Sequence, residues 1–270
     1  MCGIIAVLRG REHEENLSSE SILPRFNSAV TFLQSTLEDH EDISQQITQA
    51  GELLSEIEKE LRTVPGIGML VFDRSSALAI QGEILRANEA LQAIDRRLDH
   101  LSIDLEQLNS CLLGVRDSMW AIERDHLRTA EAIIDLAGGT PDPNALPGLM
   151  SIQTALSALD RLEVRGRDSA GIEVFVANHN LPASALEGSR FKDLILRSGA
   201  IRDCGTHIAF VYKNAAEIGD LGDNSKVIRA AIRRDEVLRE ALLSPESTVT
   251  VLGHTRWASV GVISEANAHP

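Results

Sequence analysis

The residues best suited to chemistry stand at the start of the chain, in Met1-Cys2-Gly3-Ile4. Removal of Met1 by a methionine aminopeptidase, which tolerates a small second residue, would leave Cys2 with a free α-amine. The unperturbed pKa of such an amine is about 7.7–8.0, so part of it is a free base near neutral pH. Cys2 would then hold a thiol nucleophile and a general base in one residue. On these four residues alone, a cysteine without function is the more common explanation.

Two later stretches also carry side chains with chemical potential. Arg165, Gly166 and Asp168 stand between a predicted helix and a predicted strand, a pattern that is also typical of a solvated turn after a helix. Arg256 follows a buried strand, and its planar guanidinium is suited to a carboxylate. The neighbouring Trp257 could line a pocket, although an Arg-Trp pair more often serves packing. Each stretch by itself is therefore ambiguous.

Charge and cysteine content exclude several classes of protein. The 270 residues include 40 acidic and 26 basic side chains, a formal net charge of −14, which argues against nucleic acid or an anionic membrane as partner. The three cysteines, Cys2, Cys111 and Cys204, are odd in number and lack metal-type spacing, so we expect neither a disulfide framework nor a zinc site. We also expect no other metal and no cofactor. No apolar run is long enough to cross a bilayer, and we expect a cytoplasmic protein without a membrane partner.

A long helical block follows the first strand. Apolar residues repeat at steps of three and four, which is typical of helices that bury a heptad seam. We expect helical segments over 26–61, 84–112 and 115–136, with Pro65-Gly66-Ile67-Gly68 separating the first two and Gly114 only weakly separating the last two. An antiparallel bundle or coiled-coil hairpin of about 120 residues accounts for this spacing. His40 and His126 interrupt the flanking segments as interior polar positions or as partly exposed ones, and not as ligands. The seam residues of the middle segment are Ile84, Leu91, Ile94, Leu98, Leu101, Leu105, Leu108 and Leu112.

Strand-like sequence lies on both sides of this block. Residues 2–8, 171–177, 207–212 and 248–252 alternate or are β-branched, and 149–162 and 226–243 read as amphipathic helices. We therefore predict an α+β fold in which the strand at 2–8 pairs with strands after residue 170. Residues 1–10 and 148–270 form one domain, into which residues 11–147 are inserted.

Taken together, the stretches resemble the glutaminase domain of class II glutamine amidotransferases, within the N-terminal nucleophile hydrolases. The closest resemblance is to the glutamine–fructose-6-phosphate aminotransferase family, which begins Met-Cys-Gly-Ile and carries Arg-Leu-Glu-Tyr-Arg-Gly-Tyr-Asp-Ser-Ala-Gly, His-Thr-Arg-Trp-Ala-Thr-His-Gly and Ser-Glu-x-Asn-Ala-His-Pro in this order. The counterparts here are residues 1–4, 161–171, 254–261 and 264–270. The resemblance covers roughly residues 1–9, 148–178 and 248–270 and leaves out the helical block.

The resemblance implies an αββα glutaminase domain, here partial, and assigns roles to single residues. Cys2 would attack the side-chain amide of L-glutamine, release ammonia and form a glutamyl thioester that water cleaves. Arg256 would hold the substrate α-carboxylate, and Trp257 and Ser259 would shape the glutamine pocket. Arg165 and Asp168 would order the loops beside the nucleophile. The ammonia would serve amino-sugar phosphate synthesis on a sugar-phosphate isomerase domain or subunit.

The chain departs from the family pattern at four places. Val164 and Arg167 replace tyrosines, Ser259-Val260 replaces Thr-His, and the helical block takes the place of a short helix. The family's Asn-Gly oxyanion pair and an aspartate for the substrate amine lie beyond Asn-Ala-His-Pro, where this sequence stops at Pro270. Loss of one oxyanion donor can cost about 10²–10³ in rate. We expect a fragment of a larger protein or a split gene product that is weakly active or inactive alone.

A second hypothesis belongs to a different class. The chain would be an inactive glutaminase scaffold whose helical insertion mediates self-association, as in a homo-oligomer, or binds a partner. The heptad seam is compatible with this hypothesis, but helices that bury the seam against one another explain it equally well.

Overall fold

The computed structural model describes residues 2–9, 17–37, 43–98, 105–187, 190, 197–215, 220–259 and 261–270, without the side chains of 105–107. The chain forms two compact units. Met1–Glu12 and Ala132–Pro270 make up the sheet unit, and His13–Glu131 make up the helical unit. The sequence analysis placed these boundaries at residues 10 and 147. In the structure, residues 132–147 belong to the sheet unit.

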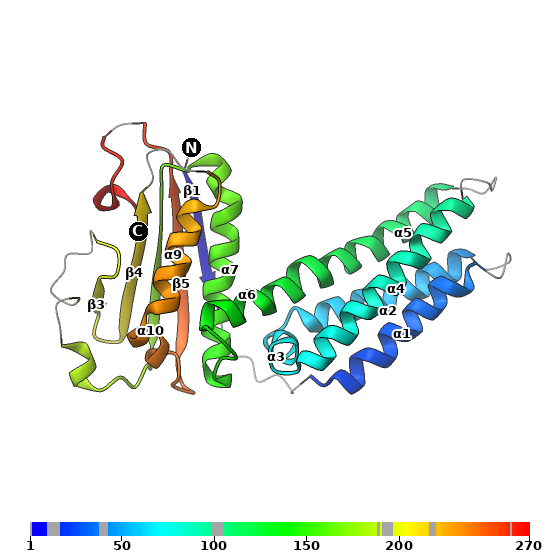
Figure 1. Cartoon of the computed structure of the whole chain (residues 1–270), viewed down its shortest axis with the longest axis horizontal. Coiled ribbons are helices and arrows are strands. Elements are labelled where there is room, and N and C mark those ends of the chain that lie inside the picture. Colours follow the sequence, from blue (N-terminus) through cyan, green and yellow to red (C-terminus); the bar gives the residue numbers. More distant parts are fainter. Residues whose placement is uncertain are drawn as a thin grey trace. The chain divides into compact units, whose positions relative to one another are not determined.

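The sheet unit is built on one five-stranded antiparallel sheet with the order β1-β5-β2-β4-β3 (Figure 1). The strands are β1 (Gly3–Leu8), β2 (Ser169–Ala177), β3 (Ile201–Asp203), β4 (His207–Ala215) and β5 (Thr248–Arg256). β1 pairs with β5 from Gly3↔Thr255 to Leu8↔Thr250, which confirms the expected pairing of the first strand with a strand after residue 170. The mixed α and β composition of the prediction is confirmed as well.

Helices pack on one face of this sheet. α7 (Leu146–Leu162) lies against β1 and β5, and α9 (Asp223–Arg234) lies against β4 and β2 (Figure 1). The strands alternate, so that Ala170, Ile172, Val174 and Val176 of β2 are buried on the helix side. The opposite face, which we call the second face of the sheet, therefore carries Cys2, which precedes β1, together with Gly171, His254 and Arg256.

The helix predicted over 226–243 is interrupted at Asp235. α9 ends at Arg234, and α10 (Glu236–Ala241) begins with Asp235 as its N-cap, whose carboxylate accepts a hydrogen bond from the amide of Leu238. The hydroxyl of Tyr212 also donates to Asp235, at 2.7 Å. An aspartate in a helical pattern favours a cap over continuation because its carboxylate competes for backbone amides.

The helical unit is a bundle in which α2 packs on α1 and α5, and α1 packs on α4. Its members are α1 (Ser19–Ser35), α2 (Ile43–Leu61), α3 (Val64–Phe72), α4 (Arg74–Leu98) and α5 (Leu105–Trp120), followed by a π-helical turn (Ala121–Leu127) and by α6 (Arg128–Ala137), which crosses into the sheet unit. The 3–4 spacing of buried Leu, Ile and Val provides the seams between these helices.

Three details of the helical prediction need correction or lie outside the described residues. The first segment is two helices, α1 and α2, and not one. For the middle segment the structure describes α4 up to Leu98 and α5 from Leu105, and residues 99–104 lie outside the described part. Leu101, the side chain of Leu105 and His40 lie outside the described part of the chain. α5 does pass through Gly114 without a break, as its weak separation suggested.

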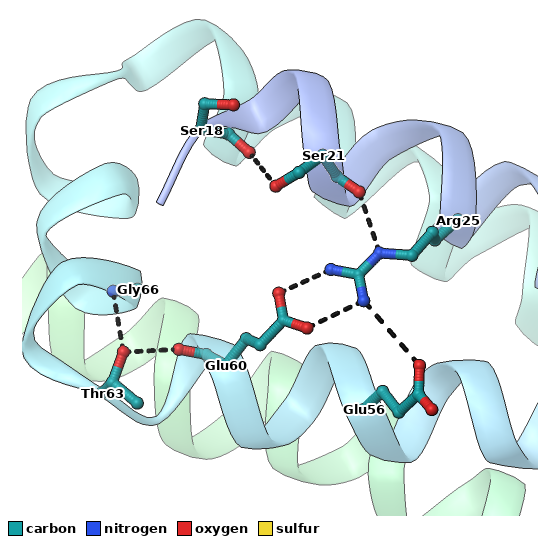
Figure 2. Close-up of polar contacts among 7 residues, drawn as sticks. All are labelled: Ser18, Ser21, Arg25, Glu56, Glu60, Thr63 and Gly66. Carbon is teal, nitrogen blue, oxygen red and sulfur yellow. Dashed lines mark hydrogen bonds and ion pairs between the residues drawn. The ribbon is translucent and has the colours of Figure 1, made fainter. Parts of the chain in front are cut away.

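The Pro65–Gly68 segment starts a helix instead of separating two. Thr63 is the N-cap of α3: its hydroxyl accepts a hydrogen bond from the amide of Gly66 at 3.2 Å and donates to the carbonyl of Glu60 (Figure 2). Proline suits the first turn of a helix because the amide it lacks has no partner there. Gly66 is required by proximity, since a Cβ would lie 2.2 Å from the carbonyl oxygen of Glu60.

Polar contacts reinforce the bundle at two places. Arg25 of α1 donates to both carboxylate oxygens of Glu60 on α2, one of them at 2.8 Å, and lies 3.8 Å from Glu56 (Figure 2). The buried Glu58 accepts hydrogen bonds from Arg62 and lies 3.1 Å from Nε2 of His126, which sits in the π-helical turn. Burial lowers the pKa of His126, so its imidazole is neutral at pH 7.

Candidate functional site

Cys2 lies at one end of the sheet, immediately before the edge strand β1, and it is exposed. The next residue, Gly3, pairs with Thr255 of β5, and its amide donates to Oγ1 of Thr255 at 3.2 Å. A Cβ on Gly3 would lie 2.9 Å from atoms of Leu162 and Thr255. Gly3 therefore allows the chain to pack tightly against α7, which holds the position of the preceding Cys2.

Arg256 ends β5 at the same end of the sheet. One step beyond the Gly3↔Thr255 pair, the register brings Cys2 and Arg256 side by side. The β2 register places Ser169 opposite Arg256 on the other side of β5. Nη1 of Arg256 donates to the carbonyl of Asn267 at 3.1 Å. The nucleophile and the cation that the sequence singled out are therefore neighbours, although 254 residues separate them along the chain.

The loop before β2 supports the end of β5. The amide of Asp168 donates to the carbonyl of Arg256 at 3.2 Å, and its carboxylate accepts from the amide of Ala258 at 2.6 Å. Gly166 lies against the same backbone, because a Cβ there would be 2.9 Å from the carbonyl carbon of Arg256 and 3.1 Å from the amide of Trp257. These contacts fix where the chain goes after β5.

The other predicted site residues are placed less closely. Arg165 ends a short 3₁₀ turn and is exposed, and its side chain makes no hydrogen bond within the described part of the chain. Trp257 is 52% exposed, and Ser259 is exposed as well. Both follow β5 closely in the chain, just after Arg256. Val260, a departure from the family pattern, lies outside the described residues.

Residues 261–270, which we call the strap, lie over the second face of the sheet. The carbonyl oxygen of His269 comes so close to β2 that a Cβ on Gly171 would be 2.3 Å from it. The buried Nζ of Lys213 on β4 donates to the carbonyl of Ala268 at 2.8 Å. The rings of His254 and His269 meet edge to face, with centroids 5.1 Å apart. Sequence reasoning noticed this stretch for its resemblance but assigned it no role.

Glu163 is a structural residue that sequence reasoning missed. Its side chain is fully buried, accepts hydrogen bonds from the amide of Gly222 and from Ser225, whose amide and hydroxyl lie 3.2 and 3.1 Å away, and so caps the start of α9. A carboxylate at a helix N-terminus is stabilised by free amides and by the helix dipole. The available signal was an acidic residue directly after an amphipathic helix, beside the Arg165–Asp168 turn.

Three titratable side chains on this face, His254, Lys213 and Glu173, have pKa values that burial shifts toward the neutral form. Burial lowers the pKa of His254, and the nearby His269 and Arg256 lower it further. Burial also lowers the pKa of Lys213, which Glu173 and Glu265 partly offset, and it raises the pKa of Glu173. Nδ1 of His254 is buried and has no hydrogen-bond partner among the described residues. The guanidinium of Arg256 and the thiol of Cys2 therefore lie at one end of this face, and Glu173 and Glu265 act on Lys213.

Comparison with protein families, with curated proteins and with solved structures finds no match for this chain. Among the described residues, no group of three His, Cys, Asp or Glu side chains is arranged to hold a metal ion. In the same part of the chain, no helix is both long and apolar enough to cross a membrane.

Proposed function

We propose that the chain hydrolyses L-glutamine through Cys2 and supplies the ammonia for amino-sugar phosphate synthesis. The observation that supports this proposal is the strand register, which brings Cys2 beside Arg256 and places the Gly166–Asp168 loop against the same end of β5. These residues belong to three of the four stretches that carry the resemblance to class II glutamine amidotransferases.

The proposed reaction needs the removal of Met1. The free α-amine of Cys2 then takes the thiol proton, and the sulfur attacks the side-chain amide carbon of glutamine. The C–N bond breaks as ammonia leaves with the proton, and a glutamyl thioester remains. Water cleaves the thioester to glutamate and restores the thiol. Arg256 anchors the substrate α-carboxylate, for which a guanidinium at the exposed end of a strand is suited.

The delivery of ammonia to a sugar phosphate follows from the resemblance alone. A partner domain or subunit with sugar-phosphate isomerase activity would accept it. Co-purification with such a subunit, followed by glutamine-dependent formation of an amino sugar phosphate, tests this part separately from glutamine hydrolysis.

A glutamine-mimicking electrophile, 6-diazo-5-oxo-norleucine, tests the nucleophile directly. We expect one covalent adduct, located on Cys2 by peptide mass spectrometry after Met1 removal has been confirmed. Cys204, which is also exposed, is an internal control for unselective alkylation. Arg256→Ala should slow labelling of Cys2 without changing its rate with iodoacetamide, because only the amino-acid reagent carries a carboxylate. Absence of an adduct on processed Cys2 would refute the proposal.

Self-association through the helical unit is a second candidate, favoured by apolar residues on its surface. Leu78 and Leu85 of α4 are 55% and 66% exposed, and Leu113 and Trp120 of α5 are both 56% exposed. Each pair is seven residues apart, so it forms a stripe along one side of its helix. Light scattering after size exclusion should show a dimer that Leu85→Glu and Trp120→Glu dissociate. A wild-type monomer at high concentration would exclude this candidate.

A further inference from the structure

Several contacts hold the strap on the sheet unit, and one of them involves Arg256 of the candidate site. Asn267 accepts from Arg256, Ala268 accepts from Lys213, and the backbone of His269 rests on Gly171. The fourth contact is the edge-to-face packing of His269 on His254, at an interplanar angle of 89°. Within the strap, Nδ2 of Asn267 donates to the carbonyl of Val262 at 2.9 Å, which closes the loop on itself.

The contact to Arg256 has a consequence for the guanidinium. Its planar fork can present two parallel N–H groups to a carboxylate only in a defined orientation. The carbonyl of Asn267 engages Nη1 and so restricts that orientation. Gly261 lies close to the other end of the fork, since a Cβ there would be 3.6 Å from Nη2. The strap therefore contributes to the orientation of the Arg256 guanidinium.

We propose that the packing of His269 on His254 holds the strap on the sheet and thereby positions Arg256 for the carboxylate of an amino-acid substrate. His269 is a positioning residue in this scheme and not a catalytic one. The part of the proposal that concerns the substrate rests on the proposed function, whereas the attachment of the strap does not.

The state of His254 gives the contact a pH dependence. The charged and titratable groups that act on it are His269 on the strap and Arg256 on its own strand. Lys213 on β4, which Glu173 of β2 and Glu265 of the strap influence, is separated from it by Gly171 of β2. Burial lowers the pKa of His254 below its ordinary value of 6.5, followed by the effects of His269 and Arg256. Release of the strap would expose the imidazole and return its pKa toward 6.5. The attachment is therefore complete above about pH 6.5 and is lost as the pH falls below it.

Hydrogen exchange of the strap amides tests the attachment. It is read by mass spectrometry, corrected for intrinsic rates, and measured in the Cys2→Ala protein, because this test does not require catalytic activity. We expect the wild-type strap to be protected at pH 7.5 and to lose protection at pH 5.5. His254→Phe keeps an aromatic ring without a proton to gain, so its strap should stay protected at both pH values. His254→Gln serves as a second non-titrating variant if Phe impairs folding. His269→Ala should expose the strap at both values, and His269→Phe should restore protection at pH 7.5.

Two results would overturn the proposal: equal strap protection in His269→Ala and wild type, or an acid-induced loss of protection in both His254 variants equal to that of wild type.

A second measurement separates this proposal from the proposed function. Binding of L-glutamine to the Cys2→Ala protein should weaken about tenfold in His269→Ala, as expected for one impaired charge-assisted contact. No glutamine binding at all, with strap exchange as predicted, would contradict the proposed function and leave the attachment supported. Unchanged affinity with a released strap would contradict the positioning of Arg256.

Discussion

Substitution of Gly171 by alanine should detach the strap, because the new methyl group would meet backbone atoms. The Cβ would lie 2.3 Å from the carbonyl oxygen of His269 and 3.0 Å from its carbonyl carbon, whereas relaxed contacts of this kind are about 3.5 Å. The strap must therefore move by about 1 Å. The hydrogen bond from Lys213 to Ala268, now 2.8 Å long, would stretch beyond the range of a hydrogen bond.

The expected loss follows from these two effects. Overpacking a well-packed site costs about 1–3 kcal/mol, and a lost hydrogen bond to a charged group costs about 1.5–3 kcal/mol. The two costs are not added, because detachment of the strap removes the overpacking. We therefore expect the free energy of unfolding of the sheet unit to fall by about 1–3 kcal/mol, with faster hydrogen exchange in the strap.

Urea unfolding followed by the fluorescence of Trp257, in a Trp120→Phe background, measures the sheet unit. Gly253→Ala on the adjacent strand is the matched control. Its Cβ would meet Cγ2 of Ile5 at 2.7 Å on the opposite face, a side-chain atom that can move. We expect a loss below about 1 kcal/mol and an unchanged strap. Equal strap exchange in Gly171→Ala and wild type, with an equal or larger loss in Gly253→Ala, would refute the reasoning.

Three further predictions concern residues outside the strap. Glu163→Gln should lower the free energy of unfolding of the sheet unit by about 1–3 kcal/mol, because a buried carboxylate that caps α9 is lost, whereas Glu240→Gln on the surface of α10 should have no effect in the same urea assay. Thr63→Ala should destabilise the helical unit by about 1 kcal/mol through loss of the α3 cap, and Thr63→Ser should restore it. Burial lowers the pKa of His126 below 6.5, so the stability that its neutral form contributes is complete above about pH 6.5 and is lost as the pH falls below it. Urea midpoints at pH 7 and 5.5 should therefore differ more in wild type than in His126→Gln, and equal differences would contradict this account.

Much of the fold could be predicted from periodicity. Alternation in β2 and the β-branched residues of β1 identify these strands because one face of each must be buried. The 3–4 spacing of apolar residues identifies the bundle for the same reason. Helix ends were predicted less well. Pro65 and Gly66 indicate a break in a general sense, but the cap that Thr63 provides decides that a new helix starts there. Asp235 likewise reads as an ordinary polar position of a helix until its contacts with Tyr212 and Leu238 are known.

The candidate site could be predicted only in part. Cys2, Arg256 and Asp168 were recognised by residue type and order, but their proximity depends on strand register. Apolar alternation does not fix that register, because a shift of two residues keeps every side chain on the same face. Glu163 gave no strong signal because its partners, Gly222 and Ser225, lie about 60 residues further along the chain and become neighbours only through packing.

The sequence by itself indicated which residues have chemical potential and which elements to expect: a cysteine directly after Met1, an arginine at a strand end, and periodic segments that must bury one face. Tertiary structure alone decided that Cys2 and Arg256 share one end of a sheet, and that the strap lies on Gly171 with His269 against His254. The physical reason is that residue type and periodicity are local properties of the chain. Proximity arises from antiparallel pairing and from close backbone contacts between segments about 100 to 250 residues apart, as between the strap and β2 or β1 and β5.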